Sequence, residues 1–341
     1  MSERESGGWQ RPSIYDVARH AGVSHMTVSR VLNNHPNIRE STRERVLLAI
    51  EEMHYTPSSI ARALATKRAM RIGVIIDSPV QYGPSSTLHA IEHAARAAGY
   101  AISSFSLSDD EDSQIDAGVL ELVTQGVEAL CVIAPRVSSL HVLRQQITGL
   151  PILVVKAEPE AAMHTVAVDQ HAGGVLAVRH LIELGHRSIA HLAGPLDWFD
   201  ALGRLQGWRE TLEAAGLPVA PPLIGDWTSD CGHEFGRSHD FGDATAIFAA
   251  NDQMALGLVH GLAERGVRVP EDVSVVGFDD LPDARHFLPP LTTVRQDFAA
   301  LGSLALQQLL IATEGEDVVA HDRIQPLLVE RASTGAPARL G

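Results

Sequence analysis

Cysteine is scarce in this sequence, which has two in 341 residues. Cys131 lies in the apolar run ALCVIA and Cys231 in a polar stretch, so a disulfide framework is excluded and reduced thiols are indicated. Long apolar runs are also lacking, because none approaches the roughly 20 residues that a membrane-spanning helix needs. Residues 1–13 are polar and have no apolar core of a signal peptide. We therefore expect a cytoplasmic protein with no membrane partner.

Motifs of catalysis and cofactor binding are missing as well. The chain contains no GxGxxG, GxxxxGK[ST], GxSxG or HExxH. The nearest match to a metal motif, HEFGRSH, places His233 and His239 six residues apart, so they do not share one helix face as ligands at i and i+4 do. These absences predict no enzyme activity, no cofactor and no metal site.

Positive charge is in the minority, with 27 Lys and Arg against 42 Asp and Glu and a net charge of −15. Its distribution is uneven, because residues 1–70 hold ten Lys and Arg against seven Asp and Glu, whereas residues 71–341 hold 17 against 35. A basic head before an acidic body fits a head that meets phosphate and a body that does not. So small an excess of positive charge in residues 1–70 can also arise by chance. The length itself predicts two or three domains.

Residues 12–57 carry start signals for three short helices, with Gly22 between the first two. Each helix has a Ser before it, and the first and third also have an acidic residue three positions later, as in a capping box: Ser13 with Asp16, Ser24, and Ser41 with Glu44. Apolar stripes at helical spacing follow, comprising Val28, Val31 and Leu32 in the second helix and Val46, Ile50 and Met53 in the third. This pattern predicts a helix-turn-helix unit.

The second helix exposes a polar row opposite its apolar stripe. The row has the width and the hydrogen-bonding groups to enter a DNA major groove, where Arg can read guanine and Asn adenine: His25, Met26, Ser29, Arg30 and Asn33. A small helical domain for protein contacts is the alternative.

The run IYDVARHAGVSHMTVSRVLN closely resembles the headpiece of the lac repressor/galactose repressor family of bacterial transcription regulators. The resemblance implies that phosphates or bases are held by Tyr15, Ser24, Thr27, Ser29 and Asn33. It also implies that His25, Met26 and Arg30 stand where the family varies its base readers. The operator sequence therefore does not follow from the resemblance.

A very short helix is predicted after Pro57, which ends the element before it. Ser58 or Ser59 can cap this helix, and its apolar face consists of Ile60, Ala61, Leu64 and Ala65. A helix under about 12 residues is marginal alone in water, so this one forms only when something packs on it. By resemblance it is the hinge helix, which contacts the minor groove through Ser58 and Ala61 and inserts Leu64 between base pairs. An ordinary linker is the alternative.

Beyond Arg71, short apolar runs alternate with amphipathic helical segments such as SSTLHAIEHAARAAG and DQMALGLVHGLAERG. The runs that predict buried strands are RIGVII, YAISSF, ALCVIA, PILVV, TVAV, SIAHLAG, ATAIFAA and VSVVGF. This alternation predicts parallel sheets with helices on both faces, and residues 71–341 suffice for two of them.

The family resemblance extends over this region, and it is particularly close to the lac repressor branch in GDW, AANDQMALG, VVGFDD and PPLTTVRQDF. It implies an α/β periplasmic-binding-protein-like core of two doubly wound parallel-sheet subdomains, with chain crossovers near 168–171, 295–298 and 326. The expected division is a disordered N-terminus 1–11, a headpiece 12–57, a hinge 58–70, a core 71–335 and a tail 336–341. The core divides into an N-subdomain, about 71–168 and 298–326, and a C-subdomain, about 169–297 and 327–335.

A ligand of such sheets binds at the carboxyl ends of the strands. A sugar needs bidentate polar groups for its hydroxyls and an aromatic face for the apolar side of its ring. By resemblance the effector contacts are Ser85, Arg204, Trp227, Asn251, Asp279, Gln296, Phe298 and Leu301. Lys156 stands where the lac repressor branch has an acidic residue, so it either pairs with Asp279 or meets an anionic ligand.

The resulting hypothesis is a homodimer that binds a palindromic double-stranded operator and represses sugar-utilisation genes until a small, galactoside-like saccharide releases it. The chain ends without leucine heptads, so we expect a dimer and no tetramer. A corepressor-dependent member of the same family is the first alternative, and a solute-binding protein without DNA function is the second. A sugar-processing enzyme, the third, lacks a nucleophile or paired-carboxylate signature.

Overall fold

The structure is a computed structural model that describes residues 12–32, 35–55, 69–78, 80–107, 114–133, 136, 149–156, 164–315 and 321–338. The chain divides into two compact units, Met1–Ala69 and Met70–Gly341, and each is described by itself. No helix within the described ranges is both long enough and apolar enough to span a bilayer.

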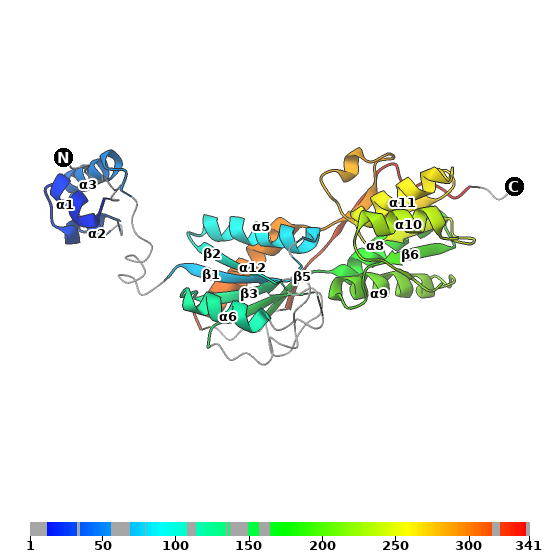
Figure 1. The fold of residues 1–341 in the computed structure, drawn as a ribbon, viewed down its shortest axis with the longest axis horizontal. Coiled ribbons are helices and arrows are strands. Elements are labelled where there is room, and N and C mark those ends of the chain that lie inside the picture. The colour runs from blue at the N-terminus through cyan, green and yellow to red at the C-terminus, as the bar shows by residue number, and fades with distance from the viewer. Residues whose placement is uncertain are drawn as a thin grey trace, which may run out of the picture. The chain divides into compact units, whose positions relative to one another are not determined.

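The first unit is a small helical head made of α1 (Ile14–His20), α2 (His25–Leu32) and α3 (Glu40–Glu52) (Figure 1). The capping box predicted at Ser13 is confirmed: its hydroxyl accepts from the Asp16 amide at 3.3 Å, and its own amide donates to the Asp16 carboxylate at 2.9 Å. The predicted stripes meet in one core, whose fully buried members are Val17, Val28, Val31, Val46 and Ala49. Gly22, with φ +64°, makes the turn that brings α2 against α1.

The capping box predicted at Ser41 is wrong. The third helix begins at Glu40 and its N-cap is Arg39, which makes no side-chain capping bond. The backbone amides of Thr42 and Arg43 donate to the Arg39 carbonyl at 2.9 and 3.0 Å. The helix thus starts before Ser41, where Glu40 places an acidic group in the first turn, next to the positive end of the helix dipole.

The second unit begins with a six-stranded sheet of order β11-β5-β4-β3-β1-β2, in which every described pairing is parallel. Its strands are β1 (Arg71–Ile76), β2 (Ala101–Ser106), β3 (Ala129–Ile133), β4 (Ile152–Val155), β5 (His164–Val168) and β11 (His321–Ile324). Helices α5 (Tyr82–Ala97) and α12 (Phe298–Thr313) pack on one face, and α6 (Gln114–Thr124) packs on the other (Figure 1). We call this sheet with its helices the N-lobe.

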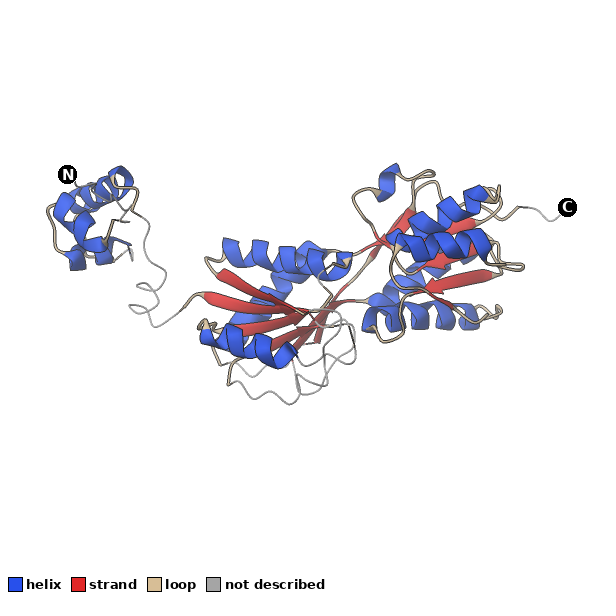
Figure 2. Cartoon of the chain, viewed as in Figure 1, coloured by secondary structure: helices blue, strands red, loops and turns tan. Residues whose placement is uncertain are grey.

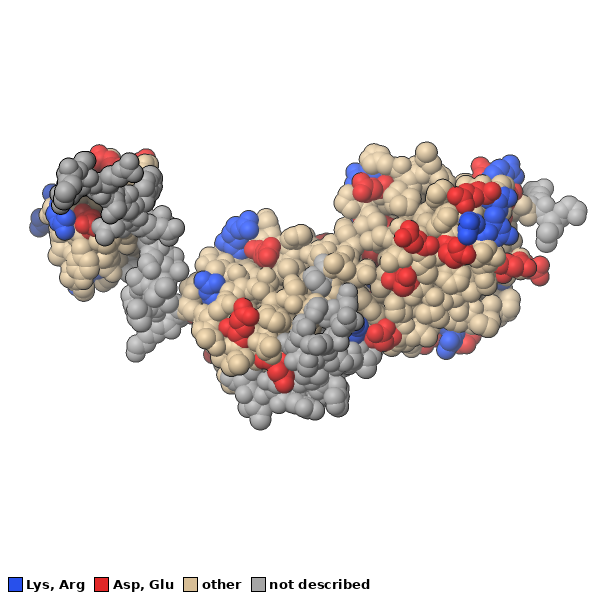
Figure 3. Space-filling model, in the orientation of Figure 1, with Lys and Arg blue, Asp and Glu red and all other residues tan. Residues whose placement is uncertain are grey.

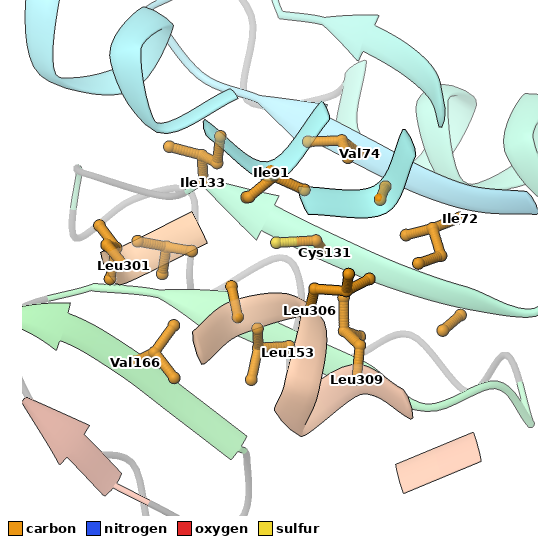
Figure 4. Packing of buried hydrophobic residues seen from close by; sticks show 14 of the residues in the cluster. Ile72, Val74, Ile91, Cys131, Ile133, Leu153, Val166, Leu301, Leu306 and Leu309 are labelled. Carbon is orange, nitrogen blue, oxygen red and sulfur yellow. The ribbon is translucent and has the colours of Figure 1, made fainter. Parts of the chain in front are cut away.

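Figure 4 shows the N-lobe core between the sheet and the pair α5 and α12. Ile91 from α5 and Leu306 from α12 meet over Cys131 of the central strand β3, and all three are buried. Burial in this apolar setting raises the pKa of the Cys131 thiol to about 12. The thiol therefore stays protonated and unreactive, in agreement with the reduced state expected from the sequence.

The other lobe, which we call the C-lobe, is built on a second six-stranded sheet of order β12-β10-β9-β8-β6-β7, in which only the described pairing of β12 is antiparallel. Its strands are β6 (Ile189–Ala193), β7 (Leu223–Ile224), β8 (Ala246–Ala249), β9 (Ser274–Asp279), β10 (Thr292–Arg295) and β12 (Leu327–Val329). Helices α8 (Gln170–Glu183) and α9 (Phe199–Ala214) cover one face, and α10 (Ser229–Ser238) and α11 (Asp252–Glu264) cover the other (Figure 2).

All eight predicted strands are present, and four further strands were not predicted. The missed strands are short or polar: β7 has two residues, β10 reads TTVR, β11 reads HDRI and β12 has three residues. None of them is a buried apolar run: β7, β11 and β12 lie at sheet edges, and β10 is buried at its first three residues but two of these are threonines. Tertiary pairing, rather than side-chain pattern, makes these segments strands.

The chain passes between the two sheets three times: from β5 to α8, from β10 to α12, and from β11 to β12. The first passage lies between Val168 and Gln170, the second between Arg295 and Phe298, and the third between Ile324 and Leu327. Three backbone segments therefore connect the lobes.

Candidate functional site

The candidate site is a cleft between the N-lobe and the C-lobe. It lies where the strand order of both sheets reverses. In the N-lobe the order reverses at β1 and β3, and in the C-lobe at β6 and β8; the carboxyl ends at such points are where open α/β sheets bind ligands. Two adjoining pockets lie in it, and between them they are lined by residues of both lobes. The residues that line both are Gly83, Pro84 and Asp200.

A continuous chain of hydrogen bonds runs along the C-lobe side of the cleft. Gln170 Nε2 donates to Gln296 Oε1 at 2.8 Å, and Gln296 Nε2 donates to Asp279 Oδ1 at 2.7 Å. Arg204 Nε donates to Gln170 Oε1 at 2.8 Å, and another of its nitrogens lies 3.6 Å from Asp279 Oδ1. All four side chains are buried. The chain of bonds fixes the orientation of every polar group in it, as a preorganised binding site requires.

Arg204 is the central cation of the cleft. It is 3% exposed, donates to the Ala250 carbonyl and lies 3.8 Å from an oxygen of Asp200. Burial raises the pKa of Asp279 to about 6, although Arg204 and the Gln296 hydrogen bond act in the opposite direction. Burial likewise raises the pKa of Asp200 against the effect of Arg204. The cation and the two carboxyl groups together form a dense polar surface for hydroxyl groups.

Two cleft residues have a positive φ angle, which residues other than glycine rarely adopt. Trp227 has φ +75° and Asp279 has φ +109°. Such conformations cost about 1–3 kcal/mol each and persist where the surroundings fix them, most often at functional sites. Asp279 is fixed by Gln296, and the Trp227 carbonyl accepts from Asn251 Nδ2 at 3.0 Å.

Asn251 caps α11, its Oδ1 accepting from the Met254 amide at 2.9 Å, and it also lines the cleft. Its neighbour Asp252 is fully buried and accepts from the Thr293 hydroxyl at 2.6 Å and the Leu281 amide at 2.8 Å. Burial, with a smaller contribution from the nearby Asp279 carboxylate, raises the pKa of Asp252 well above its ordinary value. Asp252 therefore ties α11 to the ends of β9 and β10.

Aromatic rings form the apolar part of the site. Trp198 and Trp227 make an edge-to-face pair with centroids 5.4 Å apart, and both line the pocket that Asp279 also lines. The Trp227 Nε1 proton is buried and has no hydrogen-bond acceptor among the described residues. On the N-lobe side, Tyr82 and Phe298 make a second edge-to-face pair at 5.8 Å, in which Phe298 lines the other pocket. A sugar ring needs such faces.

Lys156 and Leu301 lie at the N-lobe end of the cleft. Lys156 is 5% exposed and its Nζ lies 4.8 Å above the Phe199 ring centroid, while the ion pair of Asp279 is made by Arg204. Leu301 belongs to the N-lobe core and also lines the pocket (Figure 4).

Ser85 differs from the other expected contacts because it is absent from the lining of both pockets, and its hydroxyl donates to the Tyr82 carbonyl at 3.1 Å. Its neighbours Gly83, Pro84 and Thr87 line the cleft instead.

Four residues that sequence reasoning missed complete the site: Tyr82, Gln170, Trp198 and Asp200. Gln170 could have been predicted as a site residue, because it falls at the expected crossover near residues 168–171. Asp200 and Trp198 lie at the start of α9, in a segment with no motif, and only the fold brings them into the pocket that Asp279 lines.

The exposed face of α2 carries the residues expected to contact DNA. Met26 is 54% exposed and His25 and Arg30 are exposed, while Thr27 and Ser29 are half-buried. Ser24 caps α2 by accepting from the Thr27 amide at 3.2 Å. Tyr15, 60% exposed on α1, stacks obliquely on His25 with centroids 5.0 Å apart, which extends the α2 face onto α1. The remaining expected DNA contacts, Asn33, Ser58, Ala61 and Leu64, lie outside the described residues.

Residues 13–58 match the family model "Bacterial regulatory proteins, lacI family", and residues 178–334 match "Periplasmic binding protein-like domain". The lactose operon repressor of Escherichia coli K12 is 34% identical over 328 residues, which are 95% of this chain and 91% of that protein.

Solved structures agree. The lac repressor dimer bound to operator and the anti-inducer ONPF matches with a TM-score of 0.86 and 34% identity, covering 96% of this chain and all of that one. The complex of the transcriptional regulator CelR with cellobiose matches with a TM-score of 0.70 and 31% identity, covering 95% and 100%. The chain therefore belongs to the lacI family of bacterial regulatory proteins, a family of DNA-binding transcriptional regulators rather than enzymes.

Proposed function

We propose that this protein is a cytoplasmic homodimeric repressor that binds a palindromic operator through its heads and is released by a small saccharide bound in the cleft of its core. The observation that carries the proposal is the buried chain Arg204–Gln170–Gln296–Asp279, which presents bidentate polar groups beside two tryptophan rings. The similarity to the lac repressor dimer in complex with operator and to the transcriptional regulator CelR in complex with cellobiose supports it.

The head supplies the DNA contacts in this proposal. A single small head binds weakly, so two copies related by a twofold axis read a palindrome. His25, Met26 and Arg30 project from α2 as base readers, while Tyr15, Ser24, Thr27, Ser29 and Asn33 hold phosphates or bases. On the face shown in Figure 3, Asp and Glu side chains lie over several elements of the second unit. This negative charge is in keeping with a role away from the phosphates of DNA.

The cleft supplies the saccharide contacts. Asp279 and Arg204 offer a carboxylate and a guanidinium for adjacent hydroxyls, with Asn251 and Gln296 beside them. Trp227 and Phe298 cover the ring, Leu301 closes the apolar end, and Ser85 and Lys156 lie at the N-lobe side. The unpartnered Nε1 proton of Trp227 supports a polar ligand, because a buried donor without an acceptor costs about 1–3 kcal/mol.

Coupling between the two sites follows from where the chain crosses. Gln170 and Gln296 stand at two of the three lobe crossings, so a ligand that alters their contacts also alters the angle between the lobes. In the proposed division, residues 58–70 form a hinge that folds on DNA only when the N-subdomains of a dimer hold two copies together. Linkage then requires that saccharide and operator weaken each other by equal factors.

The test is selection of bound DNA from random sequence by the full-length protein, repeated with mono- and disaccharides. We expect one palindromic site whose recovery falls with one class of sugar. A sugar that increases recovery would identify a corepressor-dependent regulator instead, and no enriched sequence under any condition would leave only a solute-binding protein.

Two variants separate the roles. Arg30→Ala should abolish operator binding and leave saccharide affinity intact, with Arg179→Ala on the exposed face of α8 as a control for loss of charge. Asp279→Ala should give a repressor that no sugar releases, with the exposed Asp283→Ala as its control. The opposite pattern would contradict the assignment.

A further inference from the structure

Two histidines and a glutamate meet on the outer surface of the C-lobe, away from the lining of the cleft. His233 Nε2 on α10 lies 3.2 Å from Glu264 Oε2 on α11, and His260 Nε2 on α11 lies 3.5 Å from Glu264 Oε1. The two imidazole rings face each other with centroids 4.8 Å apart and an interplanar angle of 36°. One potential ligand atom from each residue lies within 4.8 Å of the other two.

The two helices that carry these residues are held at unusually short separation. Gly232 and Gly236 of α10 and Gly257 and Gly261 of α11 each face backbone atoms of the opposite helix, so closely that an added Cβ would clash. Side chains on the contacting faces of two such parallel helices have Cα atoms that lie close together. The positions of the three Cα atoms are therefore fixed by backbone packing, as a preorganised metal site requires.

The contacts within the cluster are not satisfied by hydrogen bonds alone. His233 Nε2 is shielded from solvent and lies 3.2 Å from the Glu264 carboxylate, but it makes no hydrogen bond to any of the described residues. Two imidazoles and one carboxylate form a donor set that Zn²⁺ and related ions prefer. Two atoms bound to one Zn²⁺ lie at most about 4.2 Å apart. The side chains of His260 and Glu264 are 68% and 44% exposed, which leaves them free to rotate toward this spacing.

We propose that His233, His260 and Glu264 bind one divalent transition-metal ion of the Zn²⁺ class, with water in the remaining position. The ion cross-links α10 to α11. Helix α10 follows Trp227 in the chain and α11 follows Asn251, so the ion holds together the two helices that begin at cleft residues. This inference does not depend on the identity of the effector or of the operator.

The experiment titrates the metal-free full-length protein with Zn²⁺ alone, in buffer without chelator, by calorimetry. We expect one strong equivalent per chain, and His260→Ala and Glu264→Gln should each weaken it by at least about tenfold. The matched control is His171→Ala, which removes another surface His–Glu pair, 2.7 Å from Nε2 to Glu210 Oε2, to which the described part of the chain adds no second histidine. The chain has 17 histidines, so this control measures background binding.

A thermal readout accompanies the titration, because an ion that binds only the folded chain raises its melting temperature. Zn²⁺ should raise the melting temperature of the wild type and of His171→Ala and leave that of His260→Ala unchanged. His260 is mostly exposed, so this variant should fold, which circular dichroism checks. Equal affinity and stoichiometry in wild type, His260→Ala and Glu264→Gln would overturn the proposal, as would the absence of a strong equivalent in the wild type.

Discussion

Gln170 and Gln296 stand 126 positions apart in the sequence and are joined by a hydrogen bond of 2.8 Å between their buried side-chain amides. Each residue lies at a point where the chain passes from one lobe to the other. The bond thus connects two of the three crossings directly, and it continues to Asp279 on one side and Arg204 on the other.

Gln296→Ala should lower the free energy of unfolding by about 1–3 kcal/mol, because it leaves a buried donor on Gln170 and a buried acceptor on Asp279 without their partner. Urea unfolding measures the change. Gln307→Ala, on the exposed face of α12, removes the same side chain without such bonds and should change stability by less than about 0.5 kcal/mol. Equal effects of the two substitutions would show that the bond between the crossings is unimportant for stability.

Asp279→Asn should change the pH dependence of stability. The pKa of Asp279 is about 6 in the folded chain and about 3.9 when unfolded, so folding takes up a proton between these values. The stabilisation from this proton is complete below about pH 4 and is lost as the pH rises through about 6. Relative to the Asn variant, the wild type should therefore lose up to about 3 kcal/mol across this window. Urea unfolding at several pH values checks this, and a constant difference would refute it.

Gly257→Ala should destabilise the C-lobe although alanine is the better helix former. The gain in helix propensity is about 1 kcal/mol, whereas the new Cβ would lie 2.6 Å from the His233 backbone nitrogen and even closer to the Ser229 carbonyl oxygen. Overpacking of this kind costs about 1–3 kcal/mol or more. Gly83→Ala, in a helix with nothing within 4 Å of the new Cβ, should be neutral or stabilising. Thermal unfolding that shows the same sign for both would contradict the close helix contact.

Ser13→Ala should loosen α1, because the hydroxyl caps the helix and this contribution is about 1 kcal/mol. Hydrogen exchange of the α1 backbone amides should then be roughly fivefold faster. Ser41→Ala is the matched control, since α3 begins at Glu40 and is not capped by a side chain. If exchange in α3 rose as much after Ser41→Ala, the helix would start at Ser41 as its sequence signals suggest.

The sequence by itself determined what local physical chemistry decides. Apolar stripes and the Ser13 capping box specify the helices of the head, and eight apolar runs specify strands, because the pattern is written in adjacent residues. The prediction that all eight are buried is wrong for β2, which lies at a sheet edge and has no buried residue. The family resemblance likewise located Arg204, Trp227, Asn251, Asp279 and Gln296, each of which the structure places in the cleft or its hydrogen-bond chain.

Only the tertiary structure decided which distant residues meet. Asp200 and Asp279 both lie beside Arg204 in one pocket, and His233 meets His260 across a helix pair, although no local pattern links either pair. The spacing of His233 and His239 in HEFGRSH argued against a metal site, but the fold brings His233 beside a histidine of the next helix, 27 positions later. Such encounters depend on sheet order and on glycine contacts between helices, which are long-range properties of the packed chain.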